Sequence, residues 1–322
     1  MLPVPGLEVF RGSSEGDDWS LLVTSSLQGT VFQDGRLLKY HDLVSDIWFV
    51  ARNGEIKAGV AVLRRAGNVL PGMPFAYYQG VMFSPDVDGL PIPRKSFWLL
   101  TLTNLLLETL TREYGQLHFG LHHSITDIRG FDWFNYGRPG QRRCTITPRY
   151  TALLDCSELR SVEAVLKAGR KDRRQDLRRA QQEGLTVSSG NDVDLLLRLY
   201  SAMFERQGTL VSADHRRALR AMATAAVTES IGEILFVTDR DREPVAAQLA
   251  LYDSRSGHAV ANASIDDGRL AGAATMACVA FVNRVFDKKL QWADFNGANS
   301  PARADFKHSL GASPRLFFDI HL

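Results

Sequence analysis

Cysteine is scarce in this sequence, and its few positions are unsuited to cross-linking or metal binding. The three residues, Cys144, Cys156 and Cys278, contain no Cys-x-x-Cys pair. An odd count without paired spacing excludes a disulfide framework and a zinc finger. We therefore expect a protein without a metal that folds in a reducing compartment and is cytoplasmic.

Long hydrophobic runs are also missing. Residues 1–6 contain no basic segment followed by an apolar one, so the N-terminus does not have the pattern of a signal peptide. The most apolar stretch, residues 97–110, is interrupted by polar side chains and is too short to cross a hydrocarbon core of about 30 Å. We expect a buried helix there and no transmembrane segment.

Neither sign of charge dominates, since the sequence contains 38 basic and 36 acidic residues. This balance argues against a protein that binds nucleic acid over its whole surface. Gly-x-Ser-x-Gly, P-loop and Gly-x-Gly-x-x-Gly motifs are absent as well, which disfavours hydrolases, kinases and dehydrogenases. The length of 322 residues, at roughly 150 per domain, predicts two domains or one large one.

One order of elements is present twice. Asn53-Gly54 between apolar runs predicts a hairpin, and residues 233–252 repeat that design around the turn 239–243. A helix, a short strand, a polar loop and an aromatic turn ending in glycine follow each hairpin. This degenerate repeat predicts a mixed α/β (α+β) chain of two similar halves, residues 1–155 and 156–322. Each half would hold a mixed, mostly antiparallel sheet flanked by helices.

A basic helix is predicted at residues 158–183, with Gly184 as its stop and a break at Gly169 as the alternative. Three arginines fall at i, i+4 and i+8 and so share one stripe of this helix. A stripe of this kind can grip phosphates bidentately. The alternative is a solvated face offset by neighbouring acidic residues. The predicted phosphate-binding residues are Arg170, Arg174 and Arg178.

Further candidates lie near the C-terminus. Residues 269–274 follow a predicted strand and open a predicted helix, whose N-terminus with small side chains can accept a phosphate. Asp294 and Asn299 lie at and beyond a strand end, where ligand sites of α/β proteins occur. Asp294 is a candidate to orient or deprotonate an amine. The structural alternatives are a simple helix start, a loop-capping aspartate and a turn asparagine.

This element order resembles the GNAT acyltransferase fold, and three segments are similar to the FemAB-like tandem-GNAT family. They are the basic segment 173–184, the Asp-x-x-Gly segment 294–301, and residues 305–311 with the pattern Phe-Lys-x-x-x-Gly. The first half is similar mainly in layout, through residues 30–33, and Leu37 stands where the family pattern has tryptophan.

The resemblance implies roles for individual residues. Arg269, Gly272 and Ala274 would hold the donor's pyrophosphate, and Lys307 would stabilise the tetrahedral oxyanion or bind the donor. In the first half, Trp133 stands at the place that corresponds to Lys307. The second half would therefore be catalytic, and the first would shape the acceptor side.

Three functions follow from this resemblance. The first is N-acyl transfer from acyl-CoA, such as acetyl-CoA, to an amine of a small cell-envelope or sugar precursor, with a phosphate on that acceptor as an option. The second is aminoacyl transfer from aminoacyl-tRNA, and the third is a non-catalytic double-GNAT binding module. The pattern His122-His123-x-x-x-Asp127 is similar to condensation-domain acyltransferases, but Ile128 replaces their usual glycine, so we favour an ordinary loop.

Overall fold

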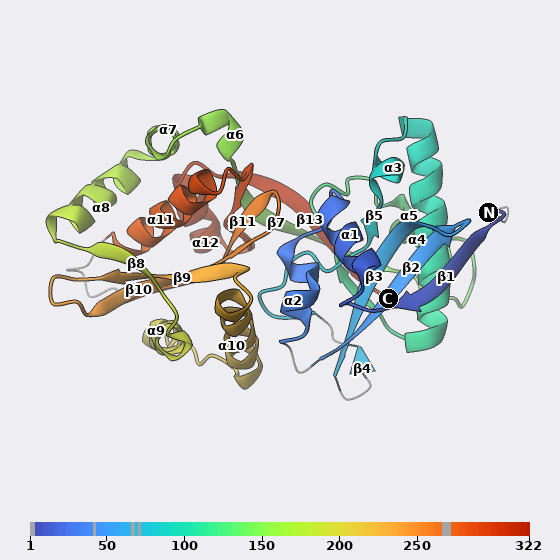
Figure 1. Cartoon of the computed structure of the whole chain (residues 1–322), viewed down its shortest axis with the longest axis horizontal. Helices are drawn as coiled ribbons and strands as arrows, with labels where there is room; N and C mark the ends of the chain where they lie inside the picture. The colour runs from blue at the N-terminus through green and yellow to red at the C-terminus, as the bar shows by residue number, and fades with distance from the viewer. Residues whose placement is uncertain (1–3, 41–42, 66–67, 70–71, 266–271) are drawn as a thin grey trace. The chain divides into compact units, whose positions relative to one another are not determined.

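The computed structural model describes residues 4–40, 43–65, 68–69, 72–265 and 272–322 (Figure 1). The chain forms two compact units, Met1–Arg149 with Leu316–Leu322, and Tyr150–Arg315. These limits differ from the expected halves, because the last residues of the chain belong to the first unit. The reason is that the end of the final strand pairs with a strand of that unit, Ile320 opposite Phe119.

The first unit is built on an antiparallel sheet in the order β1-β2-β3-β4, with β5 also paired to β3. Asn53 and Gly54 both have positive φ, at 51° and 82°, so the predicted Asn-Gly hairpin joins β2 to β3. The strands are β1 (Leu7–Gly12), β2 (Val44–Arg52), β3 (Glu55–Arg65), β4 (Asn68–Val69), β5 (Met82–Phe83) and β6 (His118–Gly120).

One long helix covers the core of the first unit. The predicted apolar helix is α4 (Ile92–Tyr114), and Gly115 ends it with φ 71°. Leu102, Leu106 and Leu110 recur at helical spacing and are fully buried against strand residues such as Val60. The other helical segments are α1 (Asp17–Ser25), η1 (Val31–Gln33), α2 (Gly35–Leu38), α3 (Pro85–Asp88) and α5 (Arg129–Asp132).

The second unit holds a sheet in the order β7-β12-β11-β10-β9-β8. Only β11 and β12 are parallel, and the other neighbours are antiparallel. The strands are β7 (Thr145–Asp155), β8 (Thr186–Gly190), β9 (Gly232–Thr238), β10 (Pro244–Tyr252), β11 (Ser256–Ser264) and β12 (Trp292–Asp294), and β13 (Ser313–His321) leads back to the first unit. The mixed α/β class predicted from the sequence is confirmed.

Helices cover both faces of this sheet. In Figure 1, α9 (Val193–Arg206) and α10 (Ala213–Thr228) lie on one side, and α8 (Lys171–Gln182) and α11 (Ala273–Asp287) lie on the other. Two covered faces explain why nearly every residue of β10 is buried. The remaining helices are α6 (Cys156–Leu159), α7 (Val162–Ala168) and α12 (Pro301–Ser309).

The single basic helix predicted at residues 158–183 is wrong, and the break at Gly169 is right. Gly169 has an extended conformation, φ −73° and ψ 173°, and it ends α7. A side chain could not replace its hydrogen, because a Cβ there would lie 2.8 Å from the carbonyl oxygen of Ser309. Among the described residues, no helix is long and apolar enough to cross a membrane.

Candidate functional site

The site lies where two parallel strands of the second unit separate. β11 and β12 pair at only three positions, of which the last joins His258 to Asp294. β12 ends there, while β11 continues to Ser264. The pairing of β11 with β10 also contains a bulge between Leu249 and Ala250. Separated strand ends expose main-chain groups, and bulges are frequent beside active sites.

Asp294 is a buried anchor of the loop that follows β12. Its side chain is 1% exposed. One carboxylate oxygen, Oδ1, accepts hydrogen bonds from the Thr151 hydroxyl and from the main-chain N–H of Asn296, the latter at 2.8 Å. The other oxygen, Oδ2, lies 3.9 Å from Nδ1 of His258. The carboxylate thus faces the protein interior, where it fixes the loop rather than meeting a solvent-borne amine.

His258 is a member of this cluster that the sequence analysis missed. Its Nε2 is 2.8 Å from Oδ2 of Asp253, and its ring is buried. Burial alone would lower the pKa of His258, but the hydrogen bond to Asp253 and the charges of Asp253 and Asp294 outweigh burial and raise it. No motif marked this histidine, because its partners come from a turn and from another strand.

Lys307, the predicted oxyanion-stabilising residue, lies on α12 and reaches the same loop. Its Nζ donates hydrogen bonds to the carbonyl oxygens of Asn296 at 2.6 Å and Gly297 at 2.8 Å. Burial lowers the pKa of Lys307 to about 8, and the nearby charge of Asp294 opposes that shift. An ammonium group has three N–H donors, so two directed at carbonyls leave a third for a ligand.

A row of uncharged polar groups continues from the bulge. Gln248, buried in β10, donates to the carbonyl oxygens of Leu249 and Ala261 at 2.8 and 3.0 Å. Asn262 donates to Oε1 of Gln248 at 3.0 Å and to Sγ of Cys278 at 3.4 Å. Burial raises the pKa of Cys278 to about 12, so this thiol stays protonated and is a poor nucleophile.

The side-chain amide of Asn299 is held by the main chain of Tyr150. Its Oδ1 accepts from the Tyr150 N–H at 2.8 Å, and its Nδ2 donates to the Tyr150 carbonyl at 3.2 Å. Both halves of the amide are thus used to tie the loop after β12 to β7. The geometry supports the turn-asparagine alternative.

The predicted pyrophosphate site is described only in part, because Arg269 lies outside the described residues. Gly272 precedes α11 with φ 105°, and a Cβ there would lie 2.2 Å from the carbonyl oxygen of Asp176. Glycine is therefore required for the close approach of α8 to the start of α11, where Ala274 lies in the first turn. The helix N-terminus is therefore also a packing contact with α8, which the motif did not indicate.

Two of the three arginines in the predicted stripe of Arg170, Arg174 and Arg178 bind protein groups. Arg170 precedes α8 and binds Asp305 bidentately, at 2.8 and 2.9 Å. Arg174 donates to the carbonyl oxygens of Leu166 and other residues at the end of α7, which it caps. Arg178 is exposed. Arg174 and Arg178 keep their spacing of four residues on α8, but Arg170 lies at the cap before the helix.

Arg173 instead is the arginine of α8 that reaches the start of α11. Its guanidinium donates to Oγ1 of Thr275 at 3.4 Å and forms an ion pair of 3.1 Å with Asp176. It also lies 5.3 Å from the ring centroid of Phe306 on α12. Because Thr275 is in the first turn of α11, a mostly buried cation lies beside the helix end that would meet an anionic carrier.

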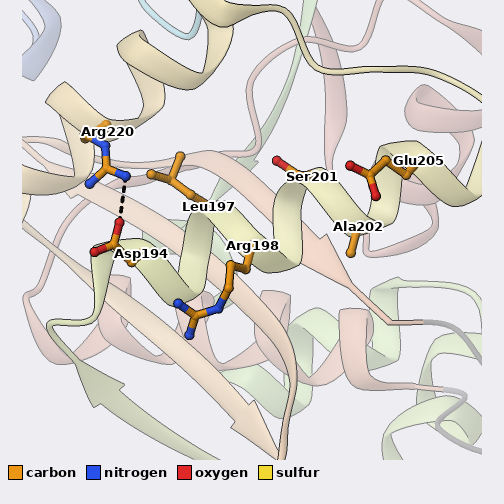
Figure 2. Close-up of a pocket in the computed structure, with 7 residues that line it drawn as sticks. All are labelled: Asp194, Leu197, Arg198, Ser201, Ala202, Glu205 and Arg220. Atoms are coloured by element: carbon orange, nitrogen blue, oxygen red, sulfur yellow. Dashed lines mark hydrogen bonds and ion pairs between the residues drawn. The ribbon is translucent and has the colours of Figure 1, made fainter.

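A shallow groove of about 480 Å³ lies elsewhere in the second unit, on the outer surface of α9 and α10 (Figure 2). An ion pair of 2.6 Å between Arg220 and Asp194 crosses it. It contains none of the predicted site residues. Its lining residues are Asp194, Leu197, Arg198, Ser201, Ala202, Glu205 and Arg220.

In the first unit, the residues of the condensation-domain pattern have other partners. Asp127 binds Arg129, with contacts of 2.5 and 2.7 Å. The rings of His122 and His123 are tilted with respect to each other, with centroids 4.0 Å apart. Among the described residues, no group of three or more histidine, cysteine, aspartate or glutamate side chains is arranged to hold a metal ion.

Comparisons with known proteins concern the family and the fold. A family model described as an acetyltransferase (GNAT) domain matches residues 167–308. Comparison with curated proteins gives no match. The structure of FemX has 12% identity and a TM-score of 0.64, with 97% of this chain and 96% of FemX covered. A tandem GNAT protein from the clavulanic acid biosynthesis pathway has 11% identity and a TM-score of 0.56, with 98% of each chain covered. The structure of L-PGS from Bacillus licheniformis has 10% identity and a TM-score of 0.52, covering 94% of this chain and 89% of that one.

These findings define the class of the protein. Residues 167–308 are an acetyltransferase domain of the GNAT type, and the chain as a whole has the tandem GNAT fold. The chain is therefore an acyltransferase. The resemblance inferred from its sequence is confirmed at this level.

Proposed function

We propose that the second unit catalyses direct transfer of an acyl group from acyl-CoA to an amine of a small cell-envelope or sugar precursor, in the cytoplasm. The observation that carries the proposal is the Lys307 ammonium, which two carbonyl oxygens hold at the point where β11 and β12 separate. A fixed cation stabilises the oxyanion of the tetrahedral intermediate as its charge develops. Because the cation is held before the reaction, little reorganisation is needed.

The state of the buried Cys278 thiol supports direct transfer. The charge of Lys307 acts on Cys278, yet burial keeps the pKa of that thiol near 12. A protonated thiol does not form an acyl-enzyme readily. We therefore propose a ternary complex in which the acceptor amine attacks the acyl donor directly.

The pyrophosphate of the donor would bind at the start of α11. Gly272 and Ala274 would let it approach the main chain, Arg269 would bind it, and Arg173 would add a cation beside Thr275. Main-chain N–H groups and the helix dipole favour an anion at such an end. Asp294 would contribute indirectly, by holding the loop whose carbonyl groups bind Lys307.

A second donor, aminoacyl-tRNA, is supported by one surface of the first unit. Trp133 and Tyr136 are 49% and 71% exposed. Arg129 and Arg143 lie 5.4 and 5.3 Å from these two rings. Exposed aromatic side chains can stack on the bases of single-stranded nucleic acid, and arginine side chains can pair with its phosphates. The FemAB-like resemblance implies the same donor.

Thermal unfolding with acetyl-CoA, longer acyl-CoAs, CoA and tRNA tests the donor. A ligand at about 100 times its Kd stabilises the native state by roughly 2.7 kcal/mol, so the true donor raises Tm by several degrees. A tRNA donor would also lose affinity steeply between 50 and about 200 mM salt. Stabilisation by tRNA alone would replace the acyl-CoA proposal, and no response to any donor would favour the binding module.

A further inference from the structure

We infer that His258 is a positioning residue for the Lys307 ammonium, acting through Asp294 and the loop of residues 294–297. The inference rests on the function proposed above and adds a residue that neither the sequence motifs nor the fold assigns. It depends on a chain of contacts from the turn between β10 and β11 to α12.

The chain begins at Asp253, which fixes the imidazole ring. Oδ1 of Asp253 accepts hydrogen bonds from the main-chain N–H groups of Arg255 at 3.0 Å and Ser256 at 2.8 Å. Oδ2 lies 2.8 Å from Nε2 of His258. A carboxylate accepts only, so Nε2 carries a proton. The ring is thereby oriented with Nδ1 toward Oδ2 of Asp294, at 3.9 Å.

Charges alternate along this chain. The groups that act on the His258 ring are Asp253 from the turn, Asp294 from β12 and the Asn296 side chain from the loop. Their combined effect raises the pKa of His258, and the hydrogen bond with His258 lowers the pKa of Asp253 against the effect of burial, so both shifts favour the charged forms of this pair. Lys307 is the next charge, and it feels Asp294. A buried carboxylate needs such a counter-charge to stay ionised.

The loop transmits the position of Asp294 to Lys307. Asp294 accepts from the N–H of Asn296, which adopts the left-handed region with φ 54°. The side chain of Asn296 donates to the Ala259 carbonyl on β11 at 3.1 Å. The carbonyl groups of Asn296 and Gly297 then hold Nζ of Lys307. We expect a change at Asp294 to displace both acceptors of the lysine, because the N–H of Asn296 is bonded to that carboxylate.

If His258 only stabilised the turn between β10 and β11, its effect would depend on its contact with Asp253 and not on Asp294. The two roles separate in a cycle of three variants of the full chain: His258→Gln, Asp294→Asn and the double variant. His258→Gln removes the ring that lies beside Oδ2 of Asp294, and Asp294→Asn removes the carboxylate itself, so both single variants break the same link and should resemble each other. The exposed His215, replaced by glutamine, is the matched control.

The first measurement is the titration of Lys307, followed through the 13C resonance of its ε-methylene group. We expect the midpoint to fall below that of the wild-type chain in both single variants, to a common value, with no further fall in the double variant. A midpoint that rises or stays unchanged in His258→Gln overturns the inference. This measurement needs no turnover, so its outcome is separate from that of the proposed acyl transfer.

The second measurement is acyl transfer with the donor found by thermal unfolding. We expect kcat to fall about tenfold in each single variant, and KM for the donor to stay within about twofold of the wild-type value. This pattern is expected when an interaction made only in the transition state is lost. The double variant should match the single ones, because residues that act as one unit are not additive. Two losses that multiply would show that His258 acts independently of Asp294 and contradict the inference.

Discussion

The two units share an order of elements but differ at the position where a catalytic site would lie. In the second unit, β12 ends at Asp294, and Lys307 follows thirteen residues later. In the first unit, the corresponding strand β6 ends at Gly120, and Trp133 follows thirteen residues later. At the positions that correspond to Asp294 and Lys307, the first unit thus has neither a carboxylate nor a cation.

Main chain closes the corresponding place in the first unit. A Cβ on Gly120 would lie 2.3 Å from the carbonyl oxygen of Tyr77, and one on Gly80 would lie 2.8 Å from that of Gly120. In the second unit, the Asn296 side chain bridges to the Ala259 carbonyl instead. The same element order thus places a buried carboxylate and a lysine in the second unit and closely packed main chain in the first.

The largest expected effect is the difference between replacing Lys307 and replacing Trp133. We predict that Lys307→Ala lowers kcat/KM by about 10²–10³, the usual loss for one oxyanion donor, and that Trp133→Ala changes kcat less than about twofold, as for a side chain without a transition-state contact. Steady-state kinetics measures both, with the exposed Lys171→Ala as a control. Equal losses at the two positions would contradict the division of roles.

The pH dependence of the reaction sharpens the same contrast. Because the pKa of Lys307 is lowered to about 8 by burial, the protonated form that stabilises the oxyanion is lost as pH rises through that value. We predict a kcat that is level below pH 8 and falls roughly tenfold per pH unit above it. A profile that rises across pH 8 would show that neutral Lys307 acts instead as a proton acceptor.

A glycine in each unit provides a comparison of stability. Gly272 combines positive φ with a blocked Cβ position, whereas Gly54 has positive φ with nothing within 4 Å. We predict that Gly54→Ala costs about 1 kcal/mol of conformational strain, and that Gly272→Ala costs roughly 1–3 kcal/mol more because α8 must shift. Denaturant unfolding measures the free energies. Equal costs would show that α8 accommodates the methyl group.

A half-buried histidine of the first unit, His118, gives the smallest expected effect. Burial and then the neighbouring His321 lower the pKa of His118 to about 4, and the two rings are tilted with centroids 4.4 Å apart. The unfolded chain binds this proton near pH 6.5, so folded-state stability is lost as pH falls from about 6.5 to 4.

We therefore predict that amides of β6 and β13 exchange faster at pH 5 than at pH 7, after correction for intrinsic rates. His118→Phe keeps the ring and removes the titration, so it should abolish this difference. His258 is the opposite case, since its raised pKa gives stability that is present below pH 6.5 and lost as pH rises through the folded value. Acid destabilisation that persists in His118→Phe would assign it to another group.

Local signals in the sequence predicted much of the fold. Asn53-Gly54 specified a hairpin because both residues tolerate positive φ, and the periodic leucines of α4 specified a buried helix. The edge strand β8, rich in serine, was missed because it lacks an apolar pattern. Its pairing with β9, rather than its composition, makes it a strand.

The sequence by itself determined the tandem order of elements, the GNAT class and the candidacy of Lys307, because these depend on patterns along the chain. Only the tertiary structure decided that Asp294 faces inward, that Arg170 and Arg174 bind protein groups, and that His258 joins the site. The physical reason is that burial and charge pairing arise between segments far apart in sequence. Residues 253, 258, 294 and 307 become neighbours only when β11 and β12 pair and α12 packs beside them.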